Sequence, residues 1–114
     1  MPEKSVFTRI IERELAADIL LENERIIVIR SIAPHAPVHL LGITKQPYVS
    51  MHSLLQDPNG KDLLWELMRE LANLAERLGI ADSGYKLTTN IGQDGGQSVL
   101  HLHVHLLGGK KLQE

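Results

Sequence analysis

The sequence lacks cysteine altogether and has few aromatic residues, with one Phe, two Tyr and one Trp in 114 residues. Without cysteine, disulfides and thiolate-bound metals are excluded, and a reducing cytoplasm is the simplest location for the protein. With so few aromatic residues, the core must consist mainly of aliphatic side chains. A small domain of this kind buries limited area, so we expect a second copy of the chain to add to its stability.

Long apolar runs and clusters of basic residues are also missing. No run approaches the roughly 20 apolar residues that span a bilayer, and residues 1–14 lack the hydrophobic centre of a secretion signal. The net charge is −2 with 23% charged residues, which argues against a broad nucleic-acid-binding surface. We therefore expect binding to neither membranes nor nucleic acids. Because no linker or repeat divides the chain, we expect a single domain over residues 1–114.

Hydrophobic spacing in the first half of the chain predicts one helix and three strands. The apolar residues of segment 5–14 share one helical face, and Ser5 is a suitable N-cap. Segments 18–23 and 26–32 are separated by polar residues and predict a hairpin, and segment 38–44 predicts a third strand. The second and third strands lack polar alternation, which is typical of strands covered on both faces.

The second half of the chain contains the most regular helical pattern. A wide apolar stripe predicts a long helix over 57–78, which Gly79 would end. Segments 85–91 and 99–107 predict two further strands. The order of helices and strands favours an α+β fold, in which a mainly antiparallel five-stranded sheet carries one short and one long helix.

Three of the six histidines, His101, His103 and His105, occupy alternate positions of the last predicted strand. Side chains alternate between the faces of a strand, so these three imidazoles would share one face. The simplest interpretation is a solvated strand face, and a second is a metal site. Same-face neighbours on a strand lie about 7 Å apart, so three ligands could hardly converge on one ion. The only carboxylate close by in the sequence is Asp94.

The residues before the histidines support a third interpretation. Gly95 and Gly96 lie in a short turn whose backbone N–H groups could form an anion-binding cradle, and Ser98 adds a hydroxyl donor. A phosphate held by backbone amides beside a nucleophilic imidazole is a workable active site.

The motif "HLHVHLL", with "NIGQDGGQS" before it and "GG" after it, resembles the histidine-triad nucleotide-binding proteins, most closely their Hint branch. The resemblance extends over "VFTRIIERE", "IAPHAPVH" and "GYKLTTNIGQDGGQSVLHLHVHLLGG". Two sister branches fit less well. Dinucleoside polyphosphate hydrolases usually lack the pair Gly108-Gly109, and hexose-phosphate uridylyltransferases carry Gln where this chain has His105.

The resemblance implies the histidine-triad fold, with the sheets of two protomers joined across a homodimer, and no cofactor or metal. It also implies hydrolysis of the P–N bond in purine nucleoside 5′-phosphoramidates, such as AMP or GMP conjugates, with release of a nucleoside monophosphate. His103 would be the nucleophile and would form a nucleotidyl-histidine intermediate. Neutral imidazole is available for this role because its ordinary pKa is about 6.5. The rival function is a non-catalytic nucleotide-binding or regulatory module.

Roles for other residues also follow from the resemblance. His105 and Ser98 would contact the phosphate or the departing amine, and His101 and His39 would orient the histidine row. The implied nucleotide-binding residues are Asn90, Gly96, Gln97 and Ser98 at the phosphate, Ser31 at the ribose, and Val6, Phe7, Ile10, Leu15, Ile29 and Leu41 around the base.

Two features depart from the family pattern. Ser31 stands where the family usually has an Asp, so we expect weaker ribose recognition. The tail after Gly109 is short, which leaves the leaving-group preference open. His35 and His52 match no family position, and we expect loop or surface roles for them.

Overall fold

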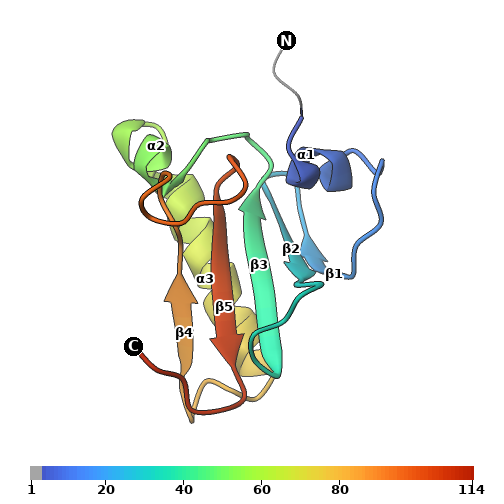
Figure 1. Cartoon of the computed structure of the whole chain (residues 1–114), viewed down its shortest axis with the longest axis vertical. Coiled ribbons are helices and arrows are strands. Elements are labelled where there is room, and N and C mark those ends of the chain that lie inside the picture. The colour runs from blue at the N-terminus through green and yellow to red at the C-terminus, as the bar shows by residue number, and fades with distance from the viewer. Residues whose placement is uncertain (1–3) are drawn as a thin grey trace.

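The hairpin predicted near the N-terminus forms the first two strands of the sheet. β1 (Ile19–Glu22) and β2 (Ile26–Arg30) pair antiparallel, as seen in the computed structural model, which describes residues 4–114 (Figure 1). The Asn23 Oδ1 atom accepts the backbone N–H groups of Arg25 at 2.8 Å and Ile26 at 3.0 Å. This side chain therefore closes a turn that contains no glycine.

The sheet has five strands in the order β1-β2-β3-β5-β4, and every neighbouring pair is antiparallel. The remaining strands are β3 (Val38–Thr44), β4 (Tyr85–Thr88) and β5 (His103–Gly108). The antiparallel five-stranded sheet and the α+β class predicted from the sequence are confirmed.

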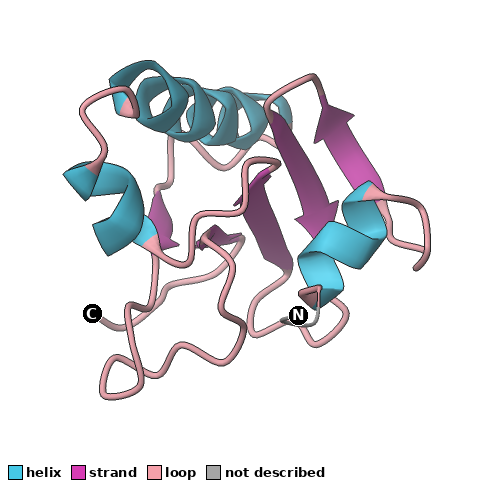
Figure 2. Cartoon of the chain, turned by 90° about the horizontal axis from the view of Figure 1, so that it is seen from above, coloured by secondary structure: helices cyan, strands magenta, loops and turns pink. Residues whose placement is uncertain are grey.

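One face of the sheet is covered by the long helix α3 (Lys61–Arg77), which is best seen in Figure 2. Its buried leucines pack with β-strand residues such as Val104 in the larger apolar cluster. Gly42 in β3 provides the room for this contact, because a Cβ atom there would lie 3.0 Å from the methyl carbons of Leu67 and Leu71. The wide apolar stripe of the sequence thus corresponds to the face that α3 buries.

The opposite face carries the short helix α1 (Val6–Ile11), which begins where the sequence predicts. The Ser5 side chain accepts the Thr8 N–H at 3.0 Å and caps the helix. Phe7 and Ile10 are buried in a second apolar cluster with residues of β2 and β3. Because α1 and α3 cover opposite faces, β2 and β3 are buried on both sides, as predicted.

Several elements differ from the sequence predictions; α1 ends at Ile11 rather than at residue 14, and β2 ends at Arg30 rather than at residue 32. A second short helix, α2 (Met51–Gln56), was not predicted, and α3 begins at Lys61 rather than near Asp57. The reason for the late start is a turn, in which Gly60 N–H donates to the Asp57 carbonyl at 2.9 Å.

The last two strands are shorter than predicted. β4 ends at Thr88, and β5 begins at His103, so His101 lies just before the strand. The physical reason is that Leu102 N–H donates to the Tyr48 carbonyl at 2.8 Å, beyond the end of β3, instead of continuing the ladder. Within residues 4–114, none of the helices combines the length and apolar character that crossing a bilayer requires.

Candidate functional site

His103 is the first residue of β5 and lies opposite Ile43 of β3, on the sheet face that α1 covers. Its ring packs against the edge of Phe7, with ring centroids 4.8 Å apart, and its side chain is buried. The Nδ1 atom lies 2.8 Å from the carbonyl oxygen of His101. Because a carbonyl only accepts, Nδ1 carries the proton, and Nε2 keeps the lone pair that a nucleophile needs.

His101 is held from two sides although it precedes the strand. Its Nε2 lies 2.7 Å from the Thr44 carbonyl, to which it must donate, so its Nδ1 accepts a hydrogen bond from Ser5 Oγ at 2.7 Å. The residue that caps α1 thus also fixes the tautomer of His101. Burial lowers the pKa of His101; the Thr44 carbonyl opposes this shift and the charge of His103 adds to it.

His39 and His105 form a second fixed pair in the neighbouring strands. The His35 backbone N–H donates to His39 Nδ1 at 3.1 Å, so the His39 proton lies on Nε2. That Nε2 is 2.9 Å from His105 Nδ1, which must therefore accept. Because His105 Nδ1 accepts this hydrogen bond, the His105 proton lies on Nε2, from which it can be donated to a bound ligand.

The role of His35, whose backbone amide donates the first hydrogen bond of this series, was not predicted from the sequence. Its ring also packs edge-on against that of His39, with centroids 5.5 Å apart. The only signal in the sequence was its position in a proline-flanked segment four residues before His39.

The surroundings of His39 and His105 favour the neutral forms of these two imidazoles. Burial, with a smaller contribution from the charge of His35, lowers the pKa of His39. The pKa of His105 falls to about 4, through burial first and then through the charges of the neighbouring imidazoles, that of His103 foremost. At pH 7 His105 is therefore a neutral hydrogen-bond donor rather than a cation.

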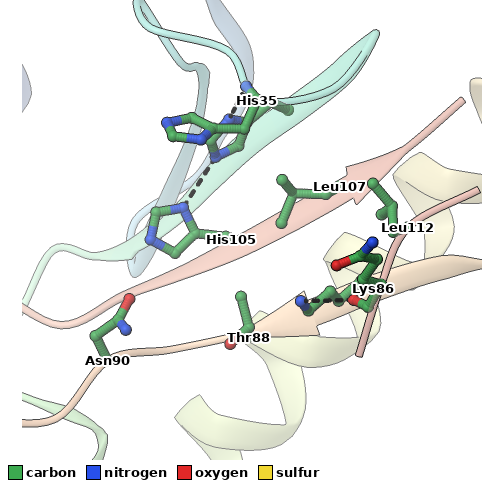
Figure 3. Close-up of a pocket in the computed structure, with 9 residues that line it drawn as sticks. His35, Lys86, Thr88, Asn90, His105, Leu107 and Leu112 are labelled. Atoms are coloured by element: carbon green, nitrogen blue, oxygen red, sulfur yellow. Dashed lines mark hydrogen bonds between the residues drawn. The ribbon is translucent and has the colours of Figure 1, made fainter. Parts of the chain in front are cut away.

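A cavity of about 330 Å³ opens beside His105. Figure 3 shows His35 and His105 on one side of it and Thr88, Asn90 and Lys86 on the other. Leu112 and Gln113 from the C-terminal tail form its far end. In the described part of the chain, no three His, Asp or Glu side chains are arranged to hold a metal ion.

The model of the HIT domain family matches residues 12–112 of the chain. The chain belongs to the HIT family. It is 41% identical over 112 residues to an uncharacterized HIT-like protein of Synechococcus elongatus, covering 98% of this chain and 96% of that protein. It is 36% identical over 112 residues to the purine nucleoside phosphoramidase of Escherichia coli, covering 98% of this chain and 92% of the relative.

Solved structures agree with this assignment. A HIT family hydrolase of Clostridium thermocellum superposes with a TM-score of 0.92 at 41% identity, covering 100% of this chain and 97% of that one. A histidine triad protein of Clostridium difficile gives a TM-score of 0.91 at 30% identity, covering 100% and 98%. The resemblance drawn from the sequence and the fold that it implied for the single chain are confirmed.

The glycine loop of this HIT protein differs from the open cradle expected from the sequence. The Gly96 N–H donates to the Gln93 carbonyl and the Gln97 N–H to the Gly92 carbonyl, both at 3.0 Å. The loop amides at these two positions are therefore already used within the loop. Asn90, at the cavity edge, donates from Nδ2 to the Gly95 carbonyl at 2.8 Å.

The Gln97 side chain braces this loop rather than projecting from it. Its Oε1 accepts the Gly92 N–H at 2.9 Å, and its Nε2 donates to the carbonyls of Val49 at 2.6 Å and Val99 at 3.0 Å. Ser98 follows as an exposed residue, and within residues 4–114 its hydroxyl has no hydrogen bond to a histidine.

The apolar residues predicted around the base divide into two groups. Five of them belong to, or pack against, the second apolar cluster, which lies between α1 and the sheet. These five are Phe7, Ile10, Ile29, Leu15 and Leu41. Val6 is 41% exposed and lies outside this cluster. Ser31 follows β2, where its N–H donates to the His39 carbonyl at 2.9 Å and its Oγ accepts the Ala33 N–H at 3.2 Å.

The lowered pKa values of His39, His101 and His105 predict how stability depends on pH. In the unfolded chain these imidazoles titrate near pH 6.5, so the unfolded state binds more protons below that pH. Their contribution to the free energy of unfolding is complete above about pH 6.5 and is lost as the pH falls from there toward 4. We expect the urea concentration at the unfolding midpoint to decrease as the pH is lowered from 7.5 to 5. Most carboxylates titrate below this pH range.

Two variants make this measurement specific. His105→Asn is expected to flatten the pH dependence, whereas His52→Asn, which changes an exposed residue of α2, should leave its slope as it is. A urea midpoint that stays constant from pH 7.5 to pH 5 would contradict the assignment of neutral imidazoles to His39, His101 and His105.

Proposed function

We propose that this HIT protein is a hydrolase of purine nucleoside 5′-phosphoramidates, such as AMP or GMP conjugates, that releases the nucleoside 5′-monophosphate without a cofactor. The observation that carries the proposal is the 2.8 Å contact between His103 Nδ1 and the His101 carbonyl, which leaves Nε2 unprotonated. The Escherichia coli relative named purine nucleoside phosphoramidase supports the choice of substrate.

The first step of the proposed mechanism exchanges one P–N bond for another. The lone pair of His103 Nε2 attacks the α-phosphorus, and the bond from phosphorus to the amine breaks with its electron pair on the amine nitrogen. The amine takes up a proton, which His105 Nε2 or the Ser98 hydroxyl passes on from water. His103 keeps its proton on Nδ1, and the hydrogen bond to the His101 carbonyl stabilises the positive ring.

In the second step, water attacks the phosphorus of the nucleotidyl-histidine. The bond from phosphorus to Nε2 breaks, its electron pair returns to the ring, and the proton of the attacking water is released to solvent. The product is the nucleoside 5′-monophosphate, and His103 is restored to its starting tautomer. Splitting the reaction in this way is ordinary covalent catalysis.

For nucleotide binding we propose the residues that the family resemblance implies. Phe7 contacts the His103 ring, and Leu41 pairs in register with His105, so both lie beside the histidines. An apolar wall of this kind stacks a base with little discrimination of its edges. For the phosphate we propose Asn90, Ser98 and the Gly96 amide, which would exchange its bond to the Gln93 carbonyl for one to a phosphate oxygen.

We also propose a homodimer in which α3 and the edge strand β4 meet their copies. Trp65 on α3 is 66% exposed, an unusual situation for the one tryptophan of the chain. β4 ends the sheet, so one side of this strand is free to pair with another strand. The lack of cysteine supports a cytoplasmic location.

The test is incubation with an adenosine 5′-phosphoramidate of a simple amine, with and without a chelator. We expect AMP to be released at the same rate in both, because every step is assigned to side chains of the protein. Tight binding of AMP without turnover would instead support the non-catalytic nucleotide-binding module. Loss of turnover with the chelator would contradict the metal-free mechanism.

A further inference from the structure

Lys86 lies on the histidine face of the sheet, at the far end of the cavity from Asn90 (Figure 3). It pairs with Leu107 in the antiparallel register of β4 and β5, and Thr88 pairs with His105. Residues two apart on a strand lie about 7 Å apart on the same face. The Lys86 Cα therefore lies about 7 Å along the strand from Thr88, which is the residue paired with His105.

The Lys86 ammonium is held in place without being neutralised. Its Nζ donates one hydrogen bond, at 3.2 Å, to the backbone carbonyl of Gln113. A lysine ammonium has three N–H donors, so two remain for another acceptor. Within residues 4–114 Lys86 forms no ion pair, and neither Asp nor Glu is among the residues that line the cavity.

The walls between His105 and Lys86 are suited to a short aliphatic segment. Leu107 and Leu112 line this part of the cavity, and Thr88 contributes a methyl group. The cavity thus has a hydrogen-bond donor at the histidine end, apolar walls in the middle and a cation at the far end. A ligand that fits it is an amine joined by a few methylene groups to an anion.

We infer that this cavity binds the leaving amine, and that Lys86 selects amines that carry an anionic group, such as a carboxylate. The inference rests on the proposed function, because it names the second half of the substrate that His103 would cleave. The anion would accept hydrogen bonds from the two remaining N–H donors of the ammonium. The carbonyl of Gln113 orients that ammonium, which gives the short C-terminal tail a role in specificity.

The test compares two adenosine 5′-phosphoramidates that differ only in charge, those of 4-aminobutyrate and of its neutral amide. We expect kcat/KM to be about 2- to 5-fold higher for the acid, the range that one partly exposed charge pair supplies. The ratio should fall to about one in Lys86→Met and be largely retained in Lys86→Arg. Raising the salt concentration should lower the ratio in the unmodified protein, since the pair is accessible to ions.

Lys111→Met is the matched control, because it removes the same charge from an exposed lysine that does not line this cavity. We expect this variant to keep the acid-to-amide ratio. A substrate with a phosphonate in place of the carboxylate determines which anion is preferred, and preference for either anion over the amide supports the inference.

Three results would overturn it. These are a ratio near one in the unmodified protein, a ratio that survives Lys86→Met, and an equal loss for both substrates in Lys86→Met. The last result would mean that Lys86 contacts the nucleotide phosphate instead.

Binding separates this inference from the proposed hydrolysis. The same two phosphoramidates are titrated calorimetrically into His103→Ala protein, in which turnover does not interfere. A preference for the acid that depends on Lys86 supports the subsite even if neither compound is hydrolysed by the unmodified protein. Absence of turnover would then count against the proposed function alone. Equal affinities for the two compounds would overturn the subsite whatever the turnover shows.

Discussion

Replacing His103 by alanine is expected to lower kcat/KM for an adenosine 5′-phosphoramidate by about 10⁴-fold or more, the scale seen when a covalent nucleophile is removed. The reason is that Nε2 of this ring is the atom assigned to bond to phosphorus. His105 cannot replace it, because the His39–His105 contact of 2.9 Å places the His105 proton on Nε2. The measurement is the initial rate of AMP release.

The same prediction includes an intermediate that can be trapped. We expect protein quenched during turnover to carry one added nucleotidyl group, located on His103 by peptide mass spectrometry. His52→Ala is the matched control, since it removes an exposed imidazole from α2 and should keep both the rate and the adduct. An adduct on a different residue, or a His103→Ala protein that keeps more than a few per cent of its activity, would refute the assignment.

Hydrogen bonds fix the tautomers of the histidine row before any substrate binds. His103 and His101 each donate to a backbone carbonyl, and His105 accepts from His39. Backbone groups move little, so the nucleophilic lone pair and the donor proton are already in place. Rate enhancement through such preorganisation avoids reorienting dipoles during the reaction.

The histidine row and its neighbours could be predicted because each depends on local pattern. Alternation along a strand placed His103 and His105 on one face, and the preference of Ser for the N-cap placed Ser5 at the start of α1. The resemblance to the family added His39, which no local pattern distinguishes from a core histidine. Its partner His105 comes from a strand 66 residues away in the sequence.

What could not be predicted depends on contacts between distant segments. The start of β5 is set by the bond from Leu102 to the Tyr48 carbonyl, and the second role of Ser5 depends on His101, 96 residues away. Helix α2 buries only Met51 and Leu54, and its third apolar residue, Leu55, is 58% exposed, so no continuous apolar stripe marks this helix in the sequence. The closed glycine loop was also beyond prediction, since the Gly-Gly motif indicates flexibility but not which carbonyls the amides will bind.

The second large loss of activity is expected when Gly95 of the glycine loop is replaced by alanine. A Cβ atom at this position would overlap the carbonyl oxygen of Ile91 and lie 3.0 Å from its carbonyl carbon, so the backbone of the loop must move. The movement would displace the Gly95 carbonyl that holds the Asn90 side chain. We expect kcat/KM to fall by about 10²-fold, as is typical when a positioning group shifts by about 1 Å.

Gly92→Ala separates displacement of the site from ordinary backbone strain. Gly92 has φ of +72°, so alanine there is strained by about 1 kcal/mol, but nothing lies within 4 Å of the added Cβ. Both variants should lower the urea midpoint slightly, because the loop is exposed and contributes little to the core. Only Gly95→Ala should lower kcat/KM by about 10²-fold, because only there does the added Cβ overlap Ile91 and move the backbone that holds Asn90. Equal activity in the two variants would show that the loop geometry at Gly95 has no part in phosphate binding.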